Sequence, residues 1–143
     1  MLYQPNIETL PLAELRQLQN QRLTQLVHRL YRDVPFYKQQ FDDHGIHPND
    51  IKSIADLSKL PFTKKTDLRD NYPYKMFATP MTEVRRIHAS SGTTGKPTVV
   101  GYTQNDLDIF DEVVARSLVA NRVAYSSAVS CKVSAGNTPS IIP

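Results

Sequence analysis

VRRIHASSGTTGKPTVVGY, residues 84–102, is the stretch that decides the fold class of this chain. Its two ends are rich in β-branched and aromatic residues, which favour strands. The run of Ser, Gly, Thr and Lys between them is typical of a loop. We therefore expect two strands, residues 84–89 and 98–102, joined by a polar loop.

The residues before this strand pair predict a helical first half that is broken into short pieces. From Pro11 to Tyr31, leucines recur at helical spacing between Arg, Gln and Glu, so we expect one long amphipathic helix. A proline-containing turn should end it, and a short helix should follow over residues 36–44, with Gly45 as its left-handed cap. The hydroxyls of Ser53 and Thr63 predict two further short helical stretches that begin just after them.

A second amphipathic helix is predicted after the strand pair. Thr103 should open it and should form a capping box with Asp106, three residues later. The face of this helix expected to be buried consists of Leu107, Phe110, Val114 and Leu118. The order helix, strand, loop, strand, helix indicates an α/β fold rather than a helical bundle.

Length and composition limit the classes of protein that need to be considered. With 143 residues, the chain has room for one ordinary domain. A hydrophobic content of 40% and a charged content of 22% match a globular domain and not a disordered chain. The net charge is +3, and the basic residues are scattered along the chain. Nucleic acid is therefore not an expected partner, because its binding modules usually carry a clustered basic face.

Cysteine and hydropathy patterns indicate the cellular setting. The single cysteine, Cys131, excludes an intramolecular disulfide and fits a reducing compartment. No apolar stretch is long enough to cross a membrane, and the N-terminus does not resemble a signal peptide. We therefore expect a cytoplasmic protein without a membrane partner. His44 and His47 beside Asp43 lack further ligands nearby, so we expect no metal site there.

The loop from Ser90 to Pro97 contains four hydroxyls, two glycines and a lysine in eight positions. Glycine lets backbone N–H groups approach an anion closely, and hydroxyls and the lysine ammonium donate charge-assisted hydrogen bonds to phosphate. The Walker motif is excluded, because Ser90 and Pro97 stand where it requires glycine and Ser or Thr. A solvated hairpin loop without a ligand is the alternative interpretation of the same composition.

A resemblance to a known family adds to this interpretation. The loop resembles the phosphate loop of the adenylate-forming acyl-CoA synthetase superfamily. Four segments resemble the N-terminal region of phenylacetate coenzyme A ligases: Val34-Pro35-Phe36-Tyr37, Leu60-Pro61-Phe62-Thr63-Lys64, Asp67-Leu68-Arg69-Asp70-Asn71-Tyr72-Pro73 and Ile87-His88-Ala89-Ser90-Ser91-Gly92.

The resemblance implies the N-terminal part of the large domain of an adenylate-forming enzyme. It implies an AMP-forming ligase that uses ATP and Mg²⁺ to join phenylacetate, or a related aryl acid, to coenzyme A in aromatic acid catabolism. The carboxylate attacks the α-phosphorus of ATP, and the thiol of coenzyme A then displaces AMP. The residues that would bind the ATP phosphates are Ser90, Ser91, Gly92, Thr93, Thr94, Gly95 and Lys96. His88 would lie near this site, and no catalytic residue or metal ligand is assigned to this chain.

The likeness is good from about Tyr31 to Ala120 and absent from Asn121 onward. We therefore expect residues 1–120 to be the N-terminal portion of an AMP-binding domain. Residues 121–143 form an unmatched tail that a shifted reading frame or a truncated gene would explain. Such a chain should be an inactive piece of a ligase, with open apolar faces that favour a homo-oligomer.

Two other functions remain open on the sequence. One is a module that binds a phosphate or a nucleotide without turnover. The other is a non-catalytic interaction module that uses the helix over residues 11–31 to bind a partner or a second copy.

Overall fold

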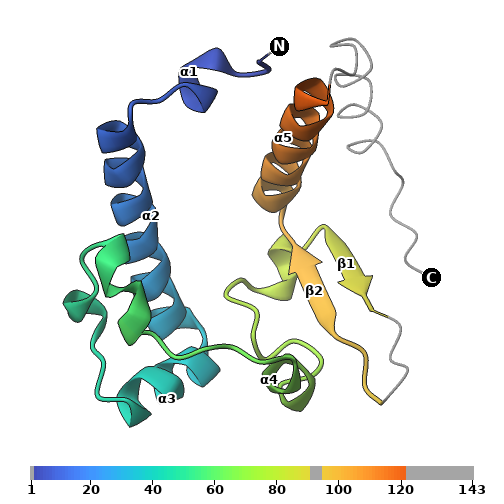
Figure 1. Cartoon of the computed structure of the whole chain (residues 1–143). Helices are drawn as coiled ribbons and strands as arrows, with labels where there is room; N and C mark the ends of the chain where they lie inside the picture. The colour runs from blue at the N-terminus through green and yellow to red at the C-terminus, as the bar shows by residue number, and fades with distance from the viewer. Residues whose placement is uncertain (1, 91–94, 122–143) are drawn as a thin grey trace. The chain divides into compact units, whose positions relative to one another are not determined.

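The structure, a computed structural model, describes residues 2–90 and 95–121 (Figure 1). The elements in chain order are α1 Pro5–Glu8, α2 Leu12–Asp33, α3 Pro35–Asp43, η1 Pro48–Asp50, η2 Ile54–Lys59, α4 Lys65–Asp70, η3 Met81–Glu83, β1 Arg86–Ala89, β2 Val99–Tyr102 and α5 Gln104–Ala120. Of the described residues, 11–82, 87–90 and 95–101 form one compact unit, and 2–10, 83–86 and 102–121 form a second. Within the described ranges, no helix has both the length and the apolar character to cross a membrane.

The predicted long helix is confirmed as α2, for which Pro11 is the N-cap residue. It ends at Asp33 because Val34, which precedes a proline, is extended with φ −122° and ψ 102°. The next helix, α3, begins at Pro35 and is followed by Gly45 with φ 63°. A positive φ favours glycine, so this residue lets the chain turn after α3 as expected.

One hydrophobic core holds α2 and α3 together with the 3-10 turns that follow them. Its buried members are Val27, Phe41 and Ile51, with exposed fractions of 1%, 3% and 1%. Partly buried side chains surround them: Leu23, Tyr31, Ile46 and Leu60. The core draws on three separate stretches of sequence, so its members stabilise the unit by joining segments that have little stability alone.

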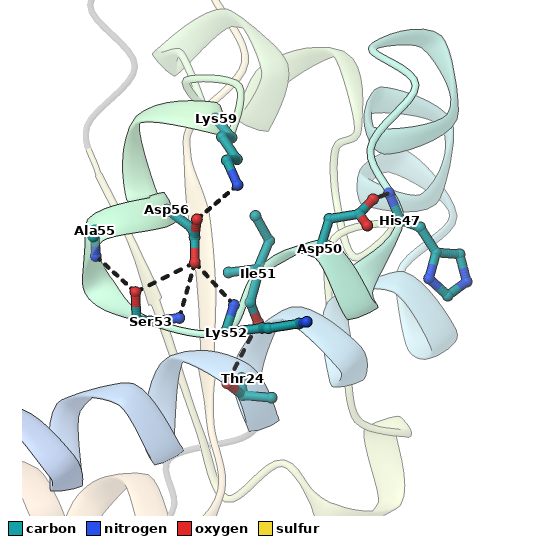
Figure 2. Close-up of polar contacts among 9 residues, drawn as sticks. All are labelled: Thr24, His47, Asp50, Ile51, Lys52, Ser53, Ala55, Asp56 and Lys59. Atoms are coloured by element: carbon teal, nitrogen blue, oxygen red, sulfur yellow. Dashed lines mark hydrogen bonds and ion pairs between the residues drawn. The ribbon is translucent and has the colours of Figure 1, made fainter.

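Ser53 is the N-cap residue of η2, as the sequence predicts, and it forms a capping box with Asp56 (Figure 2). The Asp56 carboxylate accepts hydrogen bonds from the backbone N–H groups of Lys52 and Ser53, both at 3.1 Å. Ser53 Oγ in turn accepts from the Ala55 N–H at 3.3 Å, and Lys59 Nζ lies 2.6 Å from Asp56 Oδ1. The Lys59 hydrogen bond and the two backbone donors lower the pKa of Asp56 from 3.8 to about 2.

Replacing Asp56 by asparagine should therefore remove part of the acid sensitivity of the fold. The folded carboxyl stays ionised down to about pH 2, whereas in the unfolded chain it takes up a proton near pH 3.8. Its stabilising contribution is complete above pH 3.8 and is lost as the pH falls to about 2. Denaturant unfolding at pH 5 and pH 2.5 would measure this. The free energy of unfolding should differ more between the wild type and Asp56→Asn at pH 5 than at pH 2.5. An equal difference at both values would contradict this.

The prediction that Thr63 caps the next helix is wrong. The helix α4 begins one residue later than expected, with Lys64 as its N-cap residue. The Lys64 N–H donates to Asp67 Oδ2 at 2.6 Å, so an aspartate in the first turn supplies the cap. The Thr63 hydroxyl is instead paired with the Tyr37 hydroxyl at 3.0 Å, a partner distant in sequence.

The two predicted strands are present but shorter than expected. β1 and β2 pair in one two-stranded sheet. The Arg85 N–H donates to Tyr102 O at 2.8 Å, and the Ser90 N–H donates to Thr98 O at 3.0 Å, which makes the pair antiparallel. The strands therefore approach the polar loop from both sides, as the sequence predicts.

The helix α5 has the predicted N-terminus, and its expected buried face is confirmed in part, since Leu107, Val114 and Leu118 are half-buried. Thr103 and Asp106 form the expected capping box. The buried residues are Ala115 and Val119, with Tyr3 and Leu118 packed against them. Phe110, which was expected to be buried, is 50% exposed. The small side chains at 115 and 119 allow close packing, and Arg116 strengthens this side of the helix by donating to Gln4 Oε1 at 2.6 and 3.0 Å.

Candidate functional site

The base of the polar loop is closed by two hydrogen bonds between Ser90 and Thr98. The Ser90 N–H donates to Thr98 O at 3.0 Å, and the Thr98 N–H donates to Ser90 Oγ at 3.2 Å. The Ser90 hydroxyl acts as an acceptor here, so its own proton stays available for a second hydrogen bond. These two hydrogen bonds hold the two ends of the loop next to each other, where β1 ends and β2 begins.

Gly95 and Lys96 lie at the described end of the loop. Gly95 has φ 127°, a conformation that side-chain-bearing residues rarely adopt, and a Cβ there would meet no atom of the described residues within 4 Å. As far as the described residues go, the backbone at this point is therefore open to an approaching group. The exposed Lys96 carries its ammonium 6.0 Å from the centre of the Tyr72 ring, which is the outer limit of a cation–π contact.

One buried polar atom lies directly after the loop. Within the residues described, the Thr98 hydroxyl oxygen is buried and has no hydrogen-bond partner. Such a hydroxyl is costly to leave unpaired, so a missing donor or acceptor is expected close to it.

An aromatic segment packs beside β2 and supports the site. The Tyr74 and Phe77 rings are 5.3 Å apart between centroids. A Cβ added to Gly101 would lie 2.5 Å from Phe77 Cε2 and 2.7 Å from Phe77 Cζ. Glycine is therefore required at this position of the strand, because the Phe77 ring lies directly against its backbone.

Replacing Gly101 by alanine should destabilise the protein by about 1 to 3 kcal/mol, because the added methyl group overlaps the Phe77 ring. Thermal unfolding of four proteins would measure this: the wild type, Gly101→Ala, Phe77→Leu and the double variant. The smaller Leu side chain makes room for the methyl group, so the double variant should lose less than the sum of the single losses. If the stability losses of the two single variants were strictly additive in the double variant, overlap with the Phe77 ring would not be the cause of the loss in Gly101→Ala.

The structure describes only part of the predicted phosphate-binding set. Ser90, Gly95 and Lys96 are placed as above, whereas residues 91–94 lie outside the described residues. His88 lies in β1 with an exposed side chain, close to the loop in sequence. The predicted tail, with Cys131, also lies outside the described residues apart from Asn121.

His44 and His47, which raised the question of a metal, make local hydrogen bonds. His47 Nδ1 accepts from the Asn49 N–H at 3.2 Å and caps η1, and His44 Nδ1 lies 2.7 Å from Gln40 O. In the part of the chain that the structure describes, no group of three His, Cys, Asp or Glu side chains could hold a metal ion.

Sequence reasoning did not find one residue that the structure brings to the site. Thr98 is assigned to a strand by its sequence, and the burial of its hydroxyl without a partner among the described residues is a property of the folded chain. For Tyr72, Tyr74 and Phe77 the sequence predicts a small hydrophobic cluster under the loop, with an aryl pocket as the alternative. In the structure, the Tyr74 and Phe77 rings are 5.3 Å apart and the Tyr72 ring lies 6.0 Å from the Lys96 ammonium.

Comparison with solved structures identifies the class of the fold. The described chain resembles a crystal structure of 2-hydroxyisobutyryl-CoA ligase in complex with 2-HIB-AMP and CoA, with a TM-score of 0.74 and 32% identity. The match covers 80% of this chain and 25% of that chain. The fold is therefore that of the N-terminal part of adenylate-forming CoA ligases, as the sequence predicts.

Curated relatives are similar in sequence over most of this chain. The chain is 60% identical over 120 residues to a phenylacetate-coenzyme A ligase of Thermus thermophilus, which covers 84% of this chain and 27% of the relative. It is 58% identical over 114 residues to the same enzyme of Escherichia coli, which covers 80% of this chain and 26% of the relative. No family model matches the chain.

Over about 80% of its own length, this chain is therefore similar to phenylacetate-coenzyme A ligases, at 57–60% identity. It spans about a quarter of the length of the curated relatives that it matches.

Proposed function

We propose that residues 90–96 bind the β- and γ-phosphates of ATP, in the role that this loop would have in a ligase that activates phenylacetate or a related aryl acid. The observation that carries the proposal is the loop clamped between Ser90 and Thr98, with Lys96 exposed at its end. The 57–60% identity to phenylacetate-coenzyme A ligases supports it independently.

Each of the described loop residues would contribute to phosphate binding in a different way. Lys96 supplies a mobile positive charge, worth about 4 kcal/mol against one phosphate charge at ~4 Å and an effective dielectric of ~20, before desolvation. Gly95 exposes backbone that an anion can approach, and the Ser90 hydroxyl retains a proton to donate. Together they would neutralise the pyrophosphate that departs when a carboxylate attacks the α-phosphorus.

The other substrates belong to the same proposal. ATP brings Mg²⁺ with it, since Mg²⁺ is usually held by substrate phosphates and few protein ligands. Coenzyme A and the aryl acid would complete the two half-reactions, giving phenylacetyl-CoA, AMP and pyrophosphate. Residues 1–120 are proposed as the ligase-like portion and residues 121–143 as a tail unrelated to it.

A module that binds phosphate without turnover is the second candidate. It is favoured by the described residues, which include the proposed phosphate-binding residues Ser90, Gly95 and Lys96 and none that is assigned a catalytic role. Both candidates share the loop chemistry and differ in whether a thioester forms.

Two measurements test the proposal and separate the candidates. Calorimetric titration should show that Mg-ATP and inorganic tripolyphosphate compete for one site, whereas AMP competes poorly because it lacks the β- and γ-phosphates. AMP displacing Mg-ATP with equal affinity would refute binding through the terminal phosphates. Incubation with ATP, Mg²⁺, phenylacetate and coenzyme A, followed by assay of AMP and thioester, then decides: turnover supports the ligase, and binding without turnover supports the module.

A further inference from the structure

An open groove runs between the N-terminal half of α2 and the turn η2, away from the phosphate loop in sequence. Its volume is about 620 Å³. The residues that line it are Leu12, Leu15, Arg16, Gln19, Arg22, Ile54 and Leu57. The groove has fixed walls, because Asn20 Oδ1 accepts from the Ile54 N–H at 2.9 Å and so ties η2 to α2.

The groove combines apolar surface with unpaired positive charge. Leu12 is 66% exposed and Leu57 is 56% exposed, although both are large apolar side chains. Arg16 and Arg22 come about one and about three turns after the start of α2, and both line the groove from positions about 120° apart around the helix. Among the described residues, neither guanidinium makes a hydrogen bond or an ion pair. An occupant should therefore be an apolar helix or strand that carries acidic side chains.

The same chain carries a helix with this chemistry. Three adjacent apolar residues of α5 are exposed to nearly the same extent: Ile109 at 53%, Phe110 at 50% and Val113 at 53%. Ile109 and Val113 are four residues apart, so they form one face with Phe110 at its edge. The segment from Gln104 to Ala115 contains four acids and no base: Asp106, Asp108, Asp111 and Glu112.

The acids are placed to flank that apolar face. Asp108 precedes Ile109 and Asp111 follows Phe110, so each lies about 100° around the helix from its apolar neighbour, one on either side. A helix seated on Leu12 and Leu57 through Ile109, Phe110 and Val113 would thus direct carboxylates toward Arg16 and Arg22. Such pairs at the rim of an interface determine its register and its partner more than its affinity.

We propose that the groove between α2 and η2 binds α5 of a second copy of this chain. Each copy carries both surfaces, so the α5 helix of one copy can occupy the groove of another, and the proposal is that both contacts form between the same two copies in a two-fold dimer. The dimer covers the exposed leucines of α2 and the exposed face of α5 at the same time. It does not depend on the proposed ATP site.

Light scattering after size exclusion tests the proposal on the full chain. We expect the wild type to be a dimer at high concentration and to dissociate on dilution. Arg16→Gln with Arg22→Gln should weaken the dimer about tenfold, since two exposed rim ion pairs are lost at each of its two contacts. The matched control is Gln17→Glu with Gln21→Glu, which changes the net charge equally on exposed positions of the same helix and should leave the dimer unchanged.

A charge-swap experiment gives the proposal its sharpest test. Arg16→Glu with Arg22→Glu should be monomeric, because its groove repels the acidic α5 of another copy. Asp108→Lys with Asp111→Lys should be monomeric for the converse reason. An equimolar mixture should form a mixed dimer, since each groove then meets a helix of opposite charge. A monomeric wild type at all concentrations, or a mixture that stays monomeric although each variant is folded, would overturn the proposal.

Discussion

Replacing Phe41 by alanine should lower the free energy of unfolding by about 3 to 5 kcal/mol. Phe41 is 3% exposed and belongs to the core with Val27 and Ile51. Its ring also stacks against Tyr31 at 6.2 Å between centroids. The loss would be a large part of the 5 to 15 kcal/mol by which domains are usually stable, because few other buried side chains hold this unit together. Thermal unfolding should show a decrease in Tm of more than about 10 °C.

The same substitution at Phe62 is the matched control. Phe62 is 93% exposed, so Phe62→Ala removes an equal number of atoms without opening a cavity. Its free energy of unfolding should remain within about 0.5 kcal/mol of the wild type. If both variants unfolded at the same temperature, the core described around Phe41 would not be the one that stabilises the protein.

Replacing Lys96 by alanine should weaken the binding of Mg-ATP about 10- to 100-fold. Hydrogen bonds to charged groups contribute about 1.5 to 3 kcal/mol each, and every 1.4 kcal/mol is a factor of ten in affinity. The exposed ammonium makes a cation–π contact with Tyr72 at the outer distance limit, so little is lost from the fold when it is removed. Calorimetric titration at fixed ionic strength would measure the effect.

Two variants control for charge and for the site. Lys75→Ala removes the same charge from an exposed residue outside the loop and should leave the affinity unchanged. Lys96→Arg keeps the positive charge and should retain part of the affinity, since a guanidinium also binds phosphate. Equal losses in Lys75→Ala and Lys96→Ala would mean that net charge, and not the loop, governs binding.

Local signals in the sequence predicted most elements of this fold correctly. The leucine spacing of α2, the proline after Val34 and the positive φ of Gly45 each depend on neighbours within one or two turns. The capping boxes that begin η2 and α5 depend on residues three apart. Such features are set by backbone sterics and by short-range hydrogen bonds, which a sequence displays directly.

The features that sequence reasoning missed depend on contacts between distant residues. Thr63 has the chemistry of a cap, but the Tyr37 hydroxyl takes its hydrogen bond. In α5 the fully buried residues are Ala115 and Val119, where Tyr3 and the expected Leu118 pack, whereas the expected Phe110 is exposed. Hydrophobic periodicity shows that a helix has an apolar face, but it does not show which side meets a neighbour.

The candidate site was predictable in composition but not in arrangement. The glycines, hydroxyls and lysine of the loop indicate phosphate from their chemistry alone. The clamp between Ser90 and Thr98 requires the register of the two strands, and the aromatic ring beneath Lys96 requires the path of residues 71–77. Neither arrangement is encoded within the eight residues of the loop.

We propose above all that the backbone and side chains of residues 90–96 bind the β- and γ-phosphates of ATP. Two-dimensional amide NMR of the ¹⁵N-labelled full chain, recorded while Mg-ATP is added, tests this most directly. We expect the largest shifts at the amides of residues 90–96, with the same shifts from tripolyphosphate and much smaller shifts in Lys96→Ala. Saturating Mg-ATP that leaves those amides in place, or that moves only amides elsewhere, would contradict the account.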